Sequence, residues 1–152
     1  MKRLIARAFT TLLFSALLFL GIAPNAPAQP ACSNGSLNGS FGYTNTGTIL
    51  TGPDAGPFGG VGRQTFDGKG NTQATATVSV NGNILHVTIK GTYVVNSDCT
   101  GSMVLTVIAG PETFTNRVDL VLVQGGNEFH AINTEPGSVI TTIAKKQFPN
   151  QD

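Results

Sequence analysis

The chain has 152 residues, with nine Lys and Arg against eight Asp and Glu, a formal net charge of +1, and only 11% charged residues. This composition excludes a strongly basic nucleic-acid binder, a coiled coil and a Glu- and Lys-rich helical bundle, and it is typical of a small secreted β protein. Two cysteines are too few for a zinc finger or a cysteine-bound iron–sulfur cluster.

The first residues of the chain have the features of a secretory signal peptide. An uncharged run over 8–23, rich in Leu and Phe, follows the basic residues Lys2, Arg3 and Arg7, and small residues follow at Ala26 and Ala28. The run of 16 residues is shorter than the roughly 20 that a membrane-spanning helix needs. We therefore predict a signal peptide over 1–28 and a single secreted or periplasmic domain over 29–152, without a membrane segment. A retained anchor and a lipoprotein modified at Cys32 are the alternatives.

The two cysteines, Cys32 and Cys99, would be exported into an oxidising compartment. Two cysteines allow one intramolecular pairing, so we predict a Cys32–Cys99 disulfide that ties down the start of the mature chain. Two free thiols are the alternative.

Eight β-rich runs follow, separated by Gly, Asn, Asp and Pro, and no run has a helical repeat. They cover residues 37–50, 61–66, 72–80, 84–95, 102–108, 114–123, 128–133 and 138–146. The connector Asn81-Gly82 supplies the positive φ angles of a tight hairpin, and the other connectors are also short. Short connectors join antiparallel neighbours. We therefore predict an all-β fold, an eight-stranded up-and-down barrel, with a β-sandwich as the alternative.

Alternation along the runs predicts which side chains face inward. One face is apolar and the other is polar and rich in Thr, which favours water outside the barrel. The predicted inward residues include Ala74, Ala76, Val78, Val87, Ile89, Gly91, Val118 and Leu120. The connector 51–60 has four Gly and two Pro in ten residues, so we predict that it is not a strand. It is either a disordered loop or a lid whose Phe58 touches a ligand.

The polar side chains do not form a recognisable catalytic or metal-binding motif. His86 and His130 fall on outward faces and have no HExxH spacing, and no GxSxG segment is present. The acidic residues fall in connectors or, like Asp119 and Glu128, on outward faces, so we expect no carboxylate pair that points into the barrel. We predict no metal, no cofactor and no nucleic-acid partner.

A barrel of eight strands is wide enough to hold one small ligand. The inward face carries few polar residues, Tyr43, Tyr93, Asn116 and Asn133, and small residues at Ala74, Ala76 and Gly91 leave room beside them. A few polar groups in an apolar pocket orient a ligand. We therefore predict that Tyr43, Phe58, Tyr93, Asn116 and Asn133 contact a small apolar molecule.

Four phrases in the chain, CSNGSLNGSFGY, VGRQTFDGKGN, GTYVVNSDCTGS and VLVQGGNEFHAI, span residues 32–132. In this order they resemble a group of uncharacterised small secreted bacterial β-barrel proteins, distantly similar to the allene oxide cyclase-like and lipocalin-like barrels. The resemblance implies the barrel fold and brings no activity with it. The chain departs from the lipocalin Gly-x-Trp pattern, because Phe41 stands where the tryptophan would be.

Three hypotheses for the function follow. The first is a secreted barrel that binds a small apolar molecule. The second is a structural or adhesive extracellular module with a filled barrel. The third is a cyclase- or isomerase-type enzyme, suggested by fold analogy alone, in which Tyr93, Asn116 or Asn133 polarises a bound substrate.

Overall fold

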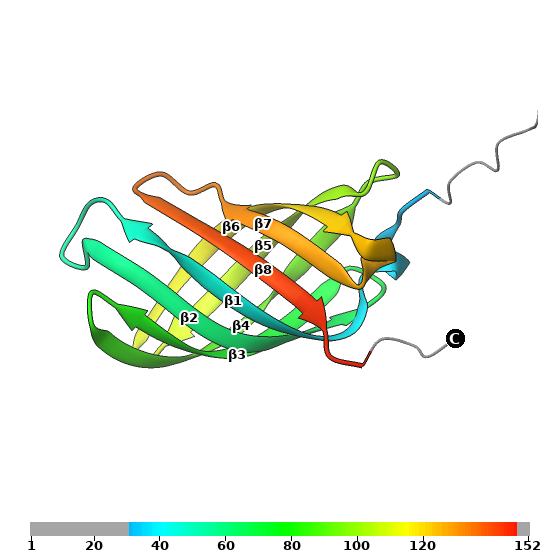
Figure 1. Cartoon of the computed structure of the whole chain (residues 1–152). Helices are drawn as coiled ribbons and strands as arrows, with labels where there is room; N and C mark the ends of the chain where they lie inside the picture. The colour runs from blue at the N-terminus through cyan, green and yellow to red at the C-terminus, as the bar shows by residue number, and fades with distance from the viewer. Residues whose placement is uncertain (1–30, 149–152) are drawn as a thin grey trace, which may run out of the picture. The chain divides into compact units, whose positions relative to one another are not determined.

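The computed structural model describes residues 31–148 of the chain, and the predicted signal peptide over 1–28 lies outside them. The described chain is a closed antiparallel barrel in which each strand pairs with the next and β1 also pairs with β8 (Figure 1). The strands are β1 (Asn38–Ile49), β2 (Gly56–Asp67), β3 (Asn71–Val80), β4 (Asn83–Val95), β5 (Thr100–Ala109), β6 (Glu112–Val123), β7 (Glu128–Asn133) and β8 (Ser138–Lys146). The predicted up-and-down barrel is therefore confirmed, and the sandwich is not formed.

The connectors use the turn chemistry expected of them. Asn81 and Gly82, between β3 and β4, have φ angles of 47° and 89°, in the region that a tight hairpin turn requires. In the β2–β3 loop the Asp67 carboxylate accepts hydrogen bonds from the Asn71 side chain at 2.6 Å and from the backbone N–H groups of Asn71 and Lys69 at 2.9 and 2.7 Å. These bonds hold the loop in one conformation.

The segment over 51–60 was predicted to be irregular, and this prediction is wrong for its second half. Strand β2 begins at Gly56 and pairs with β1 from Ile49↔Gly56 onward. The Pro57 carbonyl accepts a hydrogen bond from the Asn81 N–H at 2.8 Å, so it faces away from β1, on the side where β3 has already ended. The nitrogen of the same strand residue faces the same side, which accommodates the proline. Its missing N–H therefore costs no ladder bond to β1. Phe58 is thus a strand residue and not part of a lid.

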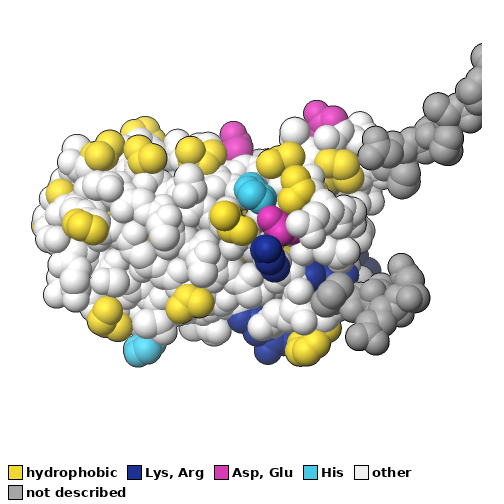
Figure 2. Space-filling view, viewed as in Figure 1, with side chains coloured by type: hydrophobic (Ala, Val, Ile, Leu, Met, Phe, Trp, Pro, Cys, Tyr) yellow, Lys and Arg dark blue, Asp and Glu magenta, His cyan; other side chains and the backbone are white. Residues whose placement is uncertain are grey.

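Most side chains that alternation places on the inward faces are buried. They include Ala74, Ala76, Val78, Val87, Tyr93, Val118, Leu120 and Leu122. Leu85 and Phe114, which alternation places on the same faces of β4 and β6, are exposed near the strand ends. On the face shown in Figure 2, apolar side chains lie singly and in small groups among polar ones. Across residues 31–148, no helix has the length and apolar character needed to cross a membrane.

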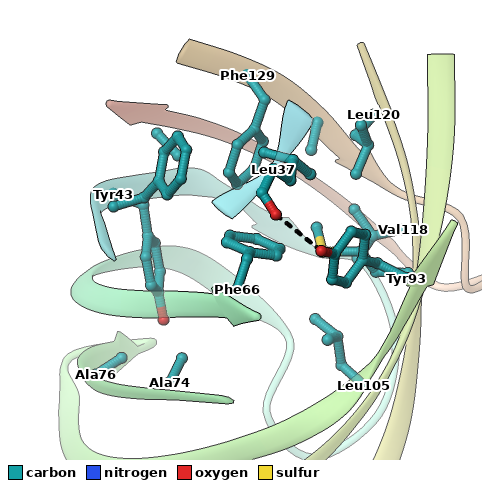
Figure 3. Close-up of a cluster of buried hydrophobic side chains, with 14 of the residues drawn as sticks. Leu37, Tyr43, Phe66, Ala74, Ala76, Tyr93, Leu105, Val118, Leu120 and Phe129 are labelled. Atoms are coloured by element: carbon teal, nitrogen blue, oxygen red, sulfur yellow. Dashed lines mark hydrogen bonds between the residues drawn. The ribbon is translucent and has the colours of Figure 1, made fainter. Parts of the chain in front are cut away.

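One end of the barrel is filled by aromatic side chains. Phe41, Phe66 and Phe129 are at most 1% exposed. Their ring centroids lie 5.4 to 5.7 Å apart, and most of the ring pairs meet edge to face. Leu37, which follows the short 3-10 helix η1 (Asn34–Ser36), is also fully buried and covers this end. The Tyr93 hydroxyl shares its one hydrogen between the carbonyls of Leu37 and Asn34, at 2.8 and 3.0 Å, and so attaches the covering segment to β4 (Figure 3).

The predicted disulfide is confirmed at the same end. Cys32 and Cys99 are bonded across 67 residues of sequence, and the chain-entropy model assigns such a loop about 4 kcal/mol of stabilisation. The bond joins the segment before η1 to the β4–β5 turn. The end with the aromatic cluster, which we call the packed end, is therefore closed by both covalent and hydrogen-bonded links.

Candidate ligand-binding cavity

The opposite end of the barrel is hollow. The β1–β2, β3–β4, β5–β6 and β7–β8 connectors lie at this open end (Figure 1). A cavity of about 380 Å³ lies inside it, and a smaller space of about 80 Å³ continues toward Gln64, Met103 and Phe129. The walls are mainly aliphatic and include Ala76, Val78, Val80, Val87, Ile89 and Val107. The cavity therefore has one mouth and an aromatic floor.

Two inward-facing glycines of β2 keep this half of the barrel open. A Cβ atom at Gly62 would lie 2.6 Å from the Tyr43 hydroxyl oxygen, and one at Gly60 would lie 2.6 Å from Asn45 Oδ1. Tyr43 and Asn45, which pair with these glycines across β1 and β2, can therefore lie flat against the wall. In Figure 3 the Tyr43 hydroxyl points toward Ala74 and Ala76. Larger side chains on β2 would push both polar residues into the cavity.

The structure brings four of the five predicted ligand-contacting residues together. Tyr43, Phe58, Asn116 and Asn133 line both the main cavity and its inner extension. Tyr93 is not among them. Its ring packs in the packed end, with its centroid 5.1 Å from that of Phe66, and its hydroxyl is hydrogen-bonded to two backbone carbonyls.

The predicted small residues also divide between the two halves of the barrel. Ala76 lines the main cavity. The space beside Gly91 is occupied, since a Cβ there would lie 2.9 Å from Leu105 Cδ2. Gly91 therefore allows close packing and contributes no room for a ligand.

The polar groups of the cavity differ in how they are satisfied. Asn133 is held within the protein, because its Nδ2 donates to Ser138 Oγ at 2.8 Å and its Oδ1 accepts the Glu135 N–H at 3.2 Å. Tyr43 is 6% exposed, and burial alone raises its pKa to about 12, so its hydroxyl stays protonated. Asn45 Oδ1 is buried without a hydrogen-bond donor from residues 31–148. Sequence reasoning missed Asn45, although alternation places it on the same face as Tyr43.

Three carboxylates lie around the mouth of the cavity. Asp54, Glu112 and Glu135 come from three different connectors or strand ends and are all part of the cavity lining. The sequence placed these acids in connectors and predicted no carboxylate pair that points into the barrel; barrel closure brings the connectors to one rim, so the three carboxylates surround the mouth without forming such a pair inside. Arg117 pairs with Glu135 at 2.7 Å, whereas neither Lys nor Arg is among the described residues that line the cavity.

Both histidines lie on the outside of the barrel. His86 shares a hydrogen bond with Thr77 Oγ1 at 3.1 Å. His130 contacts Glu128 at 2.8 Å, and Lys145 lies 3.3 Å from the same carboxylate. Glu128 was expected to point outward and it does, but its neighbours bury it, and the hydrogen bond with His130 lowers its pKa. No group of three or more potential metal ligands is found within 31–148.

Comparisons with known protein families, with curated proteins and with solved structures find no match to this chain. The resemblance to secreted bacterial barrel proteins therefore stays a prediction.

Proposed function

We propose that this protein is an exported barrel that binds one small apolar molecule inside its open end. The observation that carries the proposal is a cavity of about 380 Å³ with one mouth. Its aliphatic wall and few polar groups match the general character of small-molecule sites. The open half also favours binding over a structural module with a filled barrel.

The size of the cavity sets the size of the ligand. One water molecule takes about 30 Å³ of liquid volume, so the cavity has room for roughly a dozen groups of that size. A ligand of about eleven heavy atoms, at roughly −0.6 kcal/mol for each atom, would have a dissociation constant on the order of 10 µM. We therefore expect affinity in the micromolar range for a ligand that fits without strain.

The enzyme hypothesis has less support. It depended on Tyr93, Asn116 and Asn133 as polarising groups, and the Tyr93 hydroxyl already serves two carbonyls in the packed end. Asn116 and Asn133 line the cavity, where orientation of a ligand requires no chemistry. We therefore propose binding and not catalysis.

Filling the cavity tests the proposal. The Ala76→Phe variant places an aromatic ring in the cavity, and the Thr75→Phe variant places the same ring on the outer face of the same strand. The neutral dye Nile red serves as the probe. It has about twice as many heavy atoms as a ligand that fits wholly inside, so part of it stays in the open mouth, and its fluorescence reports transfer of the rest to an apolar site. We expect the Ala76→Phe variant to lose dye binding and Thr75→Phe to retain it, with circular dichroism confirming that both variants are folded. Equal dye binding by the two folded variants would count against an internal site.

Mass spectrometry of the protein exported by its own host tests the proposed signal cleavage and the presence of a retained ligand. The denatured mass is expected to correspond to a chain that begins at Gln29, with two hydrogens lost to the disulfide. A native mass that exceeds it by a constant amount would identify a retained ligand. A chain that keeps residues 1–28 would contradict the proposed export signal.

A further inference from the structure

Building on the proposed function, we infer that the ligand is an apolar molecule with an uncharged hydroxyl or carboxamide end, and not a carboxylate. The inference rests on two neighbouring polar groups inside the cavity and on the charge of its mouth. Each restricts the chemistry of the ligand in a different way.

Tyr43 and Asn45 supply one donor and one acceptor at neighbouring inward positions of β1. Tyr43 and Asn45 are two residues apart on β1 and share its inward face, so their Cβ atoms are roughly 7 Å apart. The Tyr43 hydroxyl is protonated and lines the cavity, and Asn45 Oδ1 has no donor within the described chain. Because the terminal torsion of Asn is broad, a small rotation turns this oxygen toward a bound group.

Only some polar groups can satisfy both partners. The ligand group must accept a hydrogen bond from the Tyr43 hydroxyl and donate one to Asn45 Oδ1. A hydroxyl and a carboxamide do both, whereas a carboxylate only accepts and an ammonium group only donates. Leaving either buried protein group unpaired would reduce the affinity.

The mouth of the cavity acts against anions in particular. Asp54, Glu112 and Glu135 line it, and among residues 31–148 a cationic partner is found for Glu135 alone, Arg117. A carboxylate ligand would pass this negative rim and would then be buried in a described lining without Lys or Arg. An ammonium ligand would be attracted to the rim but would lose its hydration inside. An uncharged end group avoids both costs.

A ten-carbon series tests the inference on the mature, disulfide-bonded protein. 1-Decanol, decanamide, decanoate and decylammonium compete with Nile red at neutral pH. We expect decanol and decanamide to bind at least about 10-fold more tightly than the two ions, which corresponds to roughly 1.4 kcal/mol. The Tyr43→Phe and Asn45→Ala variants should each weaken decanol binding about 5-fold, the effect of one net hydrogen bond. The Thr44→Val variant, on the outer face of β1, should leave it unchanged.

Removing negative charge from the mouth of the cavity is a second test, in which binding of the anionic ligand should become stronger. Asp54 and Glu112 are exposed, so the Asp54→Asn, Glu112→Gln double variant should fold normally and bind decanoate several-fold more tightly relative to decanol than the parent protein does. The inference is overturned if decanoate or decylammonium binds as tightly as decanol, or if decanol fails to displace bound Nile red. If neither Nile red nor any member of the series binds the folded protein, the proposed function itself fails.

Discussion

The two tyrosines of this chain provide a matched test of how the barrel is divided into a packed half and a hollow half. Both are buried on the inward face, at 6% exposure for Tyr43 and 2% for Tyr93. Replacing either by Phe removes one oxygen and keeps the ring. The substitutions are therefore chemically identical, and only their positions along the barrel differ.

Their expected effects on stability are different. The Tyr93→Phe variant leaves the buried Leu37 carbonyl without its 2.8 Å donor, which costs about 1–3 kcal/mol. The Asn34 carbonyl keeps a bond from Leu37 N–H at 3.1 Å, so the loss comes mainly from one acceptor. The Tyr43→Phe variant removes a hydroxyl that is desolvated by burial, and the free energy of unfolding should change by less than about 0.5 kcal/mol.

The measurement is urea unfolding at neutral pH, followed by far-ultraviolet circular dichroism with the disulfide intact. We expect the Tyr93→Phe midpoint to fall and the Tyr43→Phe midpoint to stay near that of the parent protein, with equal slopes. The corresponding thermal midpoint of Tyr93→Phe should fall by about 8 °C, for a loss of roughly 2 kcal/mol in a domain of this size. A Tyr43→Phe variant that loses as much stability as Tyr93→Phe would refute the assignment of the two hydroxyls.

Three further predictions concern the cavity wall, acid stability and the disulfide. The Gly62→Ala variant should lose about 1–3 kcal/mol of stability in urea unfolding, because its Cβ would lie 2.6 Å from the Thr75 carbonyl oxygen. It should also bind Nile red weakly, because the same Cβ would lie 2.6 Å from the Tyr43 hydroxyl, whereas Gly59→Ala, with its nearest neighbour at 3.9 Å, should do neither. Hydrogen bonds, first of all from the Asn71 side chain, lower the pKa of Asp67 to about 2. Since the unfolded value is about 3.9, the stabilisation from Asp67 should be complete above about pH 5 and lost as the pH falls toward 2. In urea unfolding between about pH 2 and 5, the free energy of unfolding of the Asp67→Asn variant should depend less on pH than that of the parent protein. The same pH dependence in both proteins would contradict this role of Asp67. Reduction of the disulfide, which spans 67 residues, should lower the free energy of unfolding by about 4 kcal/mol, and a loss below about 1 kcal/mol would contradict the entropic account.

Much of the architecture follows from local sequence. Alternation with a period of two marked the inward residues of β3, β4 and β6, because adjacent side chains on a strand must point to opposite faces. Asn81 and Gly82 marked a tight hairpin, because few other residues adopt positive φ angles without strain. A chain with two cysteines has one possible intramolecular disulfide, and Cys32–Cys99 is formed. These features depend on a few neighbouring residues or on simple counting.

Other features depend on partners far away in the sequence. The segment from Gly56 to Gly60 becomes a strand because β1 supplies hydrogen-bond partners along its whole length, despite its Gly and Pro content. Strand pairing over long distances overrides local preference in this way.

Tertiary structure also decided where the candidate site lies. Tyr43 and Tyr93 have the same alternation pattern, yet one lines the cavity and the other holds Leu37 over the packed end. Alternation specifies the face of a strand, whereas the position along the barrel axis depends on the stagger of all eight strands. Closure likewise brought Asp54, Glu112 and Glu135 to one rim. Local sequence therefore determined which side chains point inward, and only the closed, staggered barrel determined which of them face a ligand.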